Sequence, residues 1–321
     1  MTRLLALLAL AMLTSSGVQA QTYPSRAALL IVPFSEGGPT DIIGRIAADI
    51  FTRYLGKQFL VGNIGGGGGT IGALRVARAR ADGYTLVLGH MGTHAAAPAL
   101  HQDLGYDPES SFEPIGLIVE QPELVTVRRD FPANSLKEFA AYAKANESKI
   151  NMGHAGVGSV SYIGCVLLNS AIGIRPIMIP FAGTAPVMNG IVAGNIDYGC
   201  DPVLNPLPHL RTGKAKALAI AAKKRSPLLP NVPTSFEQGV PEFDCAPFYA
   251  VFAPKGTPKE VVDKLAAALN KGLDEPAVQK RFADLGAFIA EPARRGPKAL
   301  TELVKSEVAR LGPILKTASA K

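Results

Sequence analysis

The residues of this sequence that could carry chemistry lie in four turns rich in glycine and hydroxyl groups, each of which follows an apolar run. The turns cover residues 33–41, 62–70, 89–98 and 153–161. In open α/β sheets, ligands bind outside the carboxyl ends of the strands, where such turns converge. A helix that begins after such a turn offers unpaired N–H groups and a partial positive charge. The pattern therefore predicts an anion-binding site, with simple tight turns as the alternative for any one of the four.

Nucleotide binding is the first chemistry to test against these glycines. Gly67, Gly69 and Gly72 match the dinucleotide pattern GxGxxG after an apolar run. A continuous run of glycines satisfies that pattern by chance, and no acid lies about 20 positions further on to hold a ribose. No Lys-Ser or Lys-Thr pair follows the glycines, so a phosphate-binding P-loop is excluded. We therefore expect no nucleotide cofactor.

Nucleophilic and metal chemistry lack their usual patterns. Val157 and Ser161 stand on either side of Ser159, where a Gly-x-Ser-x-Gly nucleophile elbow needs glycines. A triad of a serine, a histidine and an acid remains as an unspecific alternative. His90 and His94 have i, i+4 spacing without an HExxH motif or an acidic cluster, so we expect no metal site. For His94, a polar contact with a ligand or the backbone and no role at all are both left open.

Two acids stand where they could face a ligand. Asp41 falls in the first turn of a predicted helix, where an acid favours the helix dipole. Asp201 ends the predicted strand IDYGCDP, where its side chain faces either a cleft or an ordinary turn. A carboxylate in a cleft accepts hydrogen bonds from a ligand N–H or O–H group, or excludes the wrong anion. For Asp41, both helix capping and ligand contact are left open.

The elements that position these turns alternate between short apolar runs and amphipathic helical patterns. Strands are expected at residues 28–34 and 84–90, and helices at residues 40–56 and 135–149, the last beginning with the capping box Ser135-x-x-Glu138. Repeated strand–helix units predict an α/β fold with mainly parallel sheets. Weak strand pairs and a proline-rich joint favour two lobes, joined by two crossings near residues 121 and 245.

The bulk properties indicate export. Residues 1–20 have an early arginine, a short apolar run and a small–x–small pattern, which predict a secretory signal peptide cleaved after Ala20. No later stretch approaches the ~18 apolar residues of a membrane span. The net charge of +7 comes from scattered Lys and Arg without a basic stripe, which argues against nucleic-acid binding. We expect an exported, soluble protein.

The cysteines do not indicate a framework of disulfides or a zinc site. Cys165, Cys200 and Cys245 are odd in number and contain no CxxC pair. Cys165 lies in an apolar segment and is predicted to be a buried helix residue. A bridge between Cys200 and Cys245 is left open, and the fold is not expected to depend on it.

The motifs together resemble the Bug-type extracytoplasmic solute receptors, the substrate-binding components of tripartite tricarboxylate transporters. The resemblance covers essentially the whole chain after the signal peptide. It is carried by residues 33–45, the glycine run before a helix, and residues 82–100, 106–118, 193–203, 213–234 and 253–273, in family order. The combination of these motifs is highly specific, whereas no single one is.

The resemblance implies a two-lobed, type II-like periplasmic binding protein with a ligand cleft between its α/β lobes. Residues 21–122 with 246–321 would form one lobe, and residues 123–245 the other. The implied role is the capture of a small carboxylate in the periplasm for a membrane permease, without catalysis or a cofactor, by a monomer. A sensory receptor for a membrane kinase and an exported serine hydrolase that uses Ser159 are the alternatives.

The resemblance also implies which residues bind the ligand. In such receptors, the loop after the first strand and a facing loop of the second lobe clamp a carboxylate, partly through ordered waters. By motif matching, the first side comprises Phe34, Ser35, Gly38, Thr40 and Asp41. The facing side and the remaining walls comprise Gly158, Ser159, Val160, Thr93, His94, Ala182, Gly183, Thr184 and Asp201.

Two departures from the family pattern concern the far end of the ligand. The sequence has Asn63-Ile64-Gly65-Gly66 where members often have Asn-Arg-Pro-Gly, so a basic group is missing beside the glycine run. Cys200-Asp201-Pro202 replaces a more usual apolar or amide context around the acid. Neither change removes the predicted carboxylate clamp. Both leave the identity of the distal ligand group open.

Overall fold

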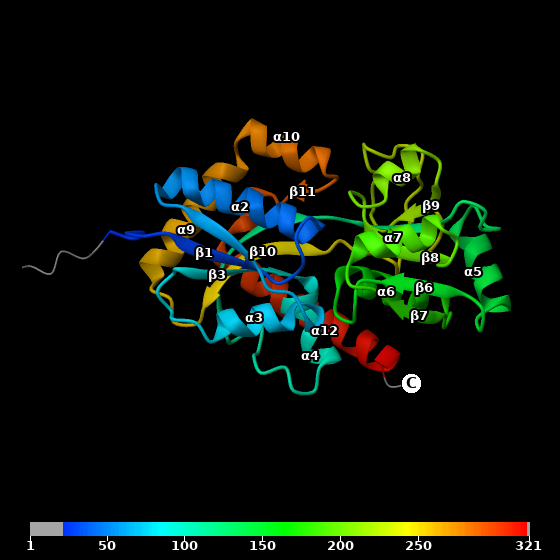
Figure 1. Cartoon of the computed structure of the whole chain (residues 1–321), viewed down its shortest axis with the longest axis horizontal. Coiled ribbons are helices and arrows are strands. Elements are labelled where there is room, and N and C mark those ends of the chain that lie inside the picture. Colours follow the sequence, from blue (N-terminus) through cyan, green and yellow to red (C-terminus); the bar gives the residue numbers. More distant parts are fainter. Residues whose placement is uncertain (1–21, 320–321) are drawn as a thin grey trace, which may run out of the picture.

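The computed structural model describes residues 22–319, so the predicted signal peptide at residues 1–20 lies outside the described residues. Within that range the chain forms two β-sheets that lie side by side, with helices on both faces of each (Figure 1). This arrangement confirms the predicted two-lobed α/β fold. Each lobe consists of one sheet with its own helices.

The first sheet has six strands in the order β11-β4-β10-β3-β1-β2. The strands are β1 (Ala28–Val32), β2 (Phe59–Asn63), β3 (Thr85–His90), β4 (Phe112–Glu120), β10 (Phe248–Pro254) and β11 (Phe288–Ile289). One face packs against α2 (Pro39–Leu55), α9 (Lys259–Leu273) and α10 (Pro276–Asp284). The other face packs against α3 (Thr70–Ala77), α4 (Ala97–Leu100) and α12 (Pro297–Ser319). Three short turns complete this part: η1 (Gly67–Gly69), η2 (Gly92–Ala96) and α11 (Pro292–Arg295).

The second sheet has five strands in the order β7-β6-β8-β5-β9. The strands are β5 (Glu123–Arg128), β6 (Asn151–His154), β7 (Ile177–Pro180), β8 (Tyr198–Pro202) and β9 (Ala215–Ile220). Helices α5 (Leu136–Ala145) and α6 (Val160–Ile172) pack on one face. Helices α7 (Thr184–Val192) and α8 (Leu207–Arg211) pack on the other.

Both sheets are mixed, because each contains a strand that runs against its neighbours. In the first sheet β10 is antiparallel to both β3 and β4, which themselves share a direction with β1 and β2. In the second sheet β5 is antiparallel to both β8 and β9. These two strands are the ones that the chain enters after passing from one sheet to the other. The sequence predicted mainly parallel sheets, and each sheet instead contains one antiparallel strand that follows a crossing between the lobes. The short strand β11 adds a second antiparallel strand at the edge of the first sheet.

Several element boundaries follow from local sequence. The first strand ends at Val32, so Pro33 and Phe34 belong to the turn that follows it. Helix α2 has Pro39 at its start and ends at Gly56, whose φ of 72° is the left-handed conformation that glycine adopts without strain. The capping box of α5 is confirmed by the Glu138 N–H, which donates to Ser135 Oγ at 3.2 Å. Local chemistry therefore sets both ends of α2 and the start of α5.

The two passages of the chain between the sheets lie side by side. The N–H of Gln121 donates to the carbonyl of Pro247 at 3.0 Å, and the N–H of Glu123 donates to that of Cys245 at 2.9 Å. Helix α12 packs against β4 of the first sheet and also against α6 of the second. A buried apolar cluster accordingly continues from one lobe into the other. Within residues 22–319, none of the helices combines the length and hydrophobicity that crossing a bilayer requires.

The three cysteines are buried and free. The bridge between Cys200 and Cys245 that the sequence left open is therefore not formed. Burial raises the pKa of both thiols well above the ordinary value, which keeps them protonated and poorly reactive. Cys165 lies in α6, as predicted.

Candidate functional site

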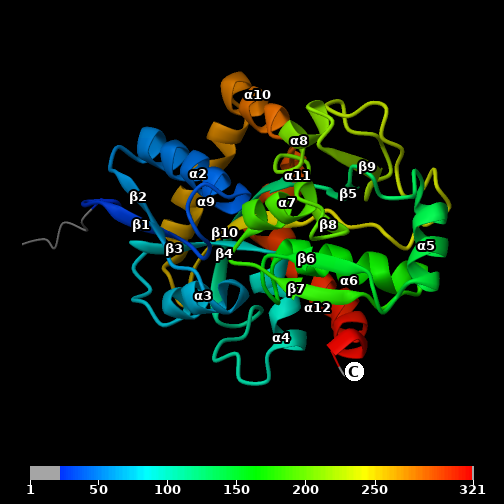
Figure 2. The same cartoon turned by 45° about the vertical axis from the view of Figure 1, so that its right-hand side comes forward.

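The turns singled out from the sequence meet between the two lobes. A Cβ atom added to Gly68 would lie 2.1 Å from the carbonyl oxygen of Val157, and one added to Gly92 would lie 2.1 Å from that of Gly158. Loops of the first lobe are thus in contact with the loop that precedes α6 in the second. Figure 2 shows α2 and α7 approaching each other across the same space. The two lobes are thus in contact at these loops, and the region between the facing loops is termed the cleft.

Asp41 fixes the first of these loops. Its Oδ2 accepts hydrogen bonds from the Gly37 N–H at 2.9 Å and from Arg45 Nε at 2.8 Å, and its Oδ1 accepts one from Asn63 Nδ2 at 2.9 Å. Burial raises the pKa of Asp41, but these hydrogen bonds outweigh it and hold the pKa below its ordinary value. Asn63 Nδ2 also donates to the carbonyl of Phe34 at 2.9 Å. These hydrogen bonds tie the loop to the first turn of α2.

Two helices begin at this cleft without a side-chain cap. Gly38 is the N-cap of α2 and Gly183 is the N-cap of α7, and neither helix start is capped by a side-chain hydrogen bond. A Cβ on Gly38 would meet only the carbonyl of Ser35, at 3.8 Å, so the space over this turn is open. The first N–H groups of a helix need acceptors and carry partial positive charge. Both helix starts are therefore suited to an anion.

Ser159 acts as a helix cap. Its Oγ donates to the carbonyl of Gly156 at 2.7 Å and accepts from the Tyr162 N–H at 3.2 Å, with Ser161 Oγ at 3.1 Å. Among the described residues, its hydrogen bonds include none to a histidine ring. A nucleophilic serine needs a base within hydrogen-bond reach. This geometry gives Ser159 the role of ordering the start of α6, next to Val160.

Thr93 and His94 are buried in the η2 turn, which follows β3. Thr93 Oγ1 accepts from the N–H of His90 at 3.1 Å and lies 2.9 Å from His94 Nδ1. The His94 ring stacks on Phe252 with 3.9 Å between centroids and lies 4.6 Å from that of Phe112. Burial lowers the pKa of His94 to about 3, so it is neutral. The polar contact that His94 makes is with the Thr93 side chain, and its other contacts are aromatic packing.

Sequence reasoning did not assign His90 to the site. Its Nδ1 accepts the Gly92 N–H at 2.8 Å, which places the proton of the neutral ring on Nε2. Burial lowers the pKa of His90 to about 3, so the ring stays neutral. Nε2 is buried and has no hydrogen-bond partner among the described residues. The ring lies 4.8 Å from that of Phe34, beside the first loop.

Asp201 lies on the opposite side of the cleft. Its Oδ2 accepts from Asn205 Nδ2 at 2.9 Å, and the same nitrogen donates to the carbonyl of Thr184 at 3.2 Å. Asn205, which the sequence did not single out, thus joins two predicted residues. Asp201 Oδ1 is buried without a partner among the described residues. Burial raises the pKa of Asp201 to about 7, against the opposing effect of the Asn205 hydrogen bond.

Glu123 and Tyr249 are further buried polar groups that the sequence did not indicate. Both carboxyl oxygens of Glu123 and the hydroxyl of Tyr249 are buried without a hydrogen-bond partner among the described residues. Burial raises the pKa of Glu123 well above its ordinary value, and the charge of Asp201 raises it further. Gly164 of α6 makes room for this side chain, since a Cβ there would lie 2.9 Å from Glu123 Cγ.

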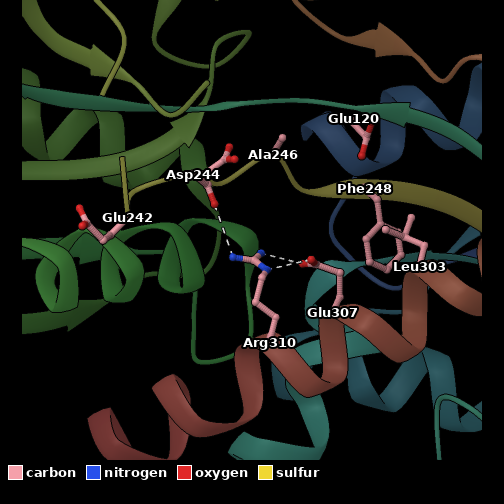
Figure 3. A pocket seen from close by; sticks show the side chains of 8 residues that line it. All are labelled: Glu120, Glu242, Asp244, Ala246, Phe248, Leu303, Glu307 and Arg310. Atoms are coloured by element: carbon pink, nitrogen blue, oxygen red, sulfur yellow. Dashed lines mark hydrogen bonds and ion pairs between the residues drawn. The ribbon is translucent and has the colours of Figure 1, made fainter. Parts of the chain in front are cut away.

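A separate cavity of about 310 Å³ lies beside the chain passages and α12 (Figure 3). Four of its lining residues are acids, and Arg310 is its only cation; the lining is Glu120, Glu242, Asp244, Ala246, Phe248, Leu303, Glu307 and Arg310. Arg310 donates to both carboxylate oxygens of Glu307, at 2.8 and 2.7 Å, and to the carbonyl of Asp244 at 3.5 Å. Acids exceed bases here, so the cavity is a poor anion site despite its size. Within residues 22–319, histidine, cysteine and acidic side chains do not gather in any group suited to a metal ion.

Comparisons with known proteins agree on one family. A family model described as "Tripartite tricarboxylate transporter family receptor" matches residues 43–319. The structure of MatC from Rhodopseudomonas palustris with bound malate superposes with a TM-score of 0.87 at 43% identity, over 91% of this chain and 100% of that one. The periplasmic binding protein BugD gives 0.85 at 42% identity, over 92% and 98%. An R. palustris protein with adipate gives 0.85 at 31% identity, over 92% and 98%.

Proposed function

The chain belongs to the tripartite tricarboxylate transporter receptor family, and from this premise we propose that it captures a small carboxylate in the periplasm and delivers it to a membrane permease. Binding is reversible, and the two lobes close on the ligand. The relatives solved with malate and adipate hold small dicarboxylates. The family description supports a transporter as partner over a sensor kinase.

The observation that carries this proposal is the pair of uncapped helix starts at the cleft. Gly38 opens α2 from the first lobe, and Gly183 opens α7 from the second. Their N–H groups give a carboxylate charge-assisted hydrogen bonds without requiring an arginine. Two such starts, one from each lobe, suit a ligand with an anionic group at each end.

We propose the following division of the chain and of its binding residues. Residues 21–122 and 246–321 form one lobe, and residues 123–245 the other, with the signal peptide at residues 1–20 removed on export. The carboxylate-binding turns are those predicted: Phe34, Ser35, Gly38 and Thr40 on one side, and Gly158, Ser159, Val160 and Ala182, Gly183 and Thr184 on the other. Asp41 and Thr93 hold the first side in position without contacting the ligand directly, since their polar atoms make hydrogen bonds within the protein.

Catalysis is not part of the proposed function. The hydroxyl proton of Ser159 is directed to a backbone carbonyl, and its oxygen caps α6. The buried histidines near the cleft, His90 and His94, have their Nδ1 atoms engaged with the η2 turn and with Thr93. The groups that a serine hydrolase would use, the serine hydroxyl and the histidine Nδ1 atoms, therefore make structural hydrogen bonds instead.

Ligand screening tests the proposal directly. The mature protein is heated with a dye reporter in the presence of di- and tricarboxylates, aromatic acids, amino acids and, as controls, neutral sugars. A true ligand at about 100 times its dissociation constant stabilises the folded state by about 2.7 kcal/mol, which a melting curve detects. A rise with one or more carboxylates and none with sugars is expected. A screen in which no carboxylate raises the melting temperature would refute the proposal.

A further inference from the structure

Several buried side chains near the junction of the lobes carry polar atoms without a hydrogen-bond partner among the described residues, among them His90, Tyr249, Asp201, Glu123 and Gln121. His90 Nε2 and the Tyr249 hydroxyl come from the first sheet, and Asp201 Oδ1 and both oxygens of Glu123 come from the second. Each of these residues is at most 2% exposed. Buried polar groups are almost always paired. Exceptions contributed by both lobes indicate the position of a polar partner from outside the chain.

Strand pairing places Tyr249 and His90 side by side and separates the two acids. Tyr249 pairs with His90 between β10 and β3, and their rings lie 5.9 Å apart. In the second sheet Leu124 pairs with Asp201, so Glu123, the residue before Leu124, points to the opposite face, toward Gly164 of α6. Burial raises the pKa of the Tyr249 hydroxyl well above its ordinary value; the charges of Glu123 and Asp201 add to this effect, and a contact with Thr40 opposes it.

The pair from the first lobe supplies hydrogen-bond donors. The Nδ1 of His90 is engaged as an acceptor, so Nε2 carries the proton. Tyr249 keeps its phenolic proton, because burial opposes ionisation. A neutral N–H and an O–H side by side match the oxygens of a carboxylate.

Asp201 of the second lobe supplies an acceptor. Asn205 donates to Oδ2 of Asp201, and Oδ1 has no donor among the described residues. Glu123 lies on the other face of the neighbouring strand β5 and takes no part in this contact. An oxygen lone pair in this position is satisfied only by an N–H or O–H group.

Resting on the proposed function, we infer that this cluster binds a carboxylate that bears a hydroxyl or amino group on the adjacent carbon. The carboxylate at the start of α2 also accepts hydrogen bonds from His90 Nε2 and the Tyr249 hydroxyl, since His90 lies beside Phe34 and Tyr249 beside Thr40. The hydroxyl or amino group donates to Asp201 Oδ1. An unsubstituted acid places a methylene group against that oxygen and leaves a buried acceptor unpaired, which a site of this kind discriminates against strongly.

The family itself does not decide this point. The relatives' structures contain malate, which has such a hydroxyl, and adipate, which has none. The preference of this chain must therefore come from its own side chains. Asp201 and its partner Asn205 are the ones that present the free acceptor.

Calorimetric titration of the wild-type protein with matched acids tests the inference. The acids are succinate, malate and aspartate, together with phenylacetate and mandelate, measured above the pKa of Asp201. Within at least one matched set, the substituted acid is expected to bind at least about tenfold more tightly than its unsubstituted counterpart. A stronger response to aspartate would identify an ammonium as the donor, and a stronger response to malate or mandelate would identify a hydroxyl.

Asp201→Asn tests the assigned atom. Asn205 donates toward residue 201, so the new carboxamide turns its oxygen to Asn205 and its NH2 group to the ligand. The acceptor becomes a donor, and the preference for the substituted acid should fall at least about tenfold, with the affinity for the unsubstituted acid nearly unchanged. Asp284→Asn, an exposed acid of α10 paired with Lys280, removes the same charge and should change neither affinity.

The outcomes separate the two proposals. Equal wild-type affinities within every matched set that binds would overturn the inference and leave the proposed function standing, because water would then satisfy these groups. A folded Asp201→Asn variant that keeps the full preference would also overturn it. Failure of the wild-type protein to bind any carboxylate would remove the proposed function together with the inference.

Discussion

Gly68 of the first lobe lies against Val157 of the second, so closely that a Cβ atom on Gly68 would come within 2.1 Å of the Val157 carbonyl oxygen. Gly68 belongs to the glycine run after β2, and Val157 to the turn before α6. Contact between these two loops is a feature of the closed arrangement. It makes the glycine run a determinant of closure, in addition to any role in binding.

Gly68→Ala should weaken ligand binding by blocking that contact. The added methyl group meets backbone, which cannot move aside as a flexible side chain can. We expect the affinity for any carboxylate ligand to fall at least about tenfold, since closure contributes to binding. Gly68 has a φ of 64°, so alanine also costs about 1 kcal/mol of stability.

Gly56→Ala is the matched control for that experiment. Gly56 has a φ of 72° and open space around its Cβ position. The variant should lose similar stability and keep the wild-type affinity in calorimetric titration. Equal affinities of both variants would show that the contact between Gly68 and Val157 does not govern closure.

Asp41→Asn should destabilise the protein and loosen the first binding loop. The Asp41 side chain is 3% exposed, and its two oxygens accept three hydrogen bonds. In asparagine an NH2 group replaces one carboxylate oxygen, and this new donor faces N–H donors that then lack an acceptor. We expect a loss of about 2–3 kcal/mol in urea unfolding. Asp49→Asn, which removes an exposed pair with Arg53, should change stability by less than about 1 kcal/mol.

Ser159→Ala should cost about 1 kcal/mol of stability through the lost cap of α6. It should also reduce ligand affinity, because the turn that contacts the first lobe is no longer ordered. Ser135→Ala removes the equivalent cap from α5, in the second lobe, and should lose similar stability at unchanged affinity. Any ester hydrolysis by the preparation that disappears in Ser159→Ala alone would contradict the non-catalytic role.

The stability of the ligand-free protein should fall as the pH rises from about 4 to about 7. Folded Asp201 keeps its proton up to a pKa of about 7, against an ordinary value of 3.8. The folded state therefore binds more protons in this window, and the difference corresponds to as much as about 4 kcal/mol. Glu123, whose pKa is also raised, acts in the same direction.

Asp201→Asn checks this assignment. Urea midpoints measured across the window should flatten in the variant relative to the wild type. Asp41 acts with the opposite sign: its pKa is lowered by folding, so its stabilisation is present above the ordinary pKa and is lost as the pH falls. An unchanged pH slope in Asp201→Asn would assign the effect to other groups.

Local sequence was enough to place several elements of the fold. The helix start at the Ser135 cap and the helix expected over residues 40–56 both appear in the structure, because such ends depend on residues within one turn. The α/β class followed from alternating strand and helix patterns. The direction of β5 and β10 did not, because it depends on where a strand inserts after the chain has crossed between lobes.

The sequence by itself also indicated which turns would come together, since glycine-rich turns after parallel strands gather at one edge of a sheet. It could not decide what the acids do there. Asp41 is fully engaged while Asp201 keeps one free oxygen, a difference that depends on partners such as Asn63 and Asn205. Only tertiary structure brings His90 and Tyr249 together and places Asp201 beside Asn205, because strand register and the crossing of the chain, both long-range, decide which buried polar groups face one another.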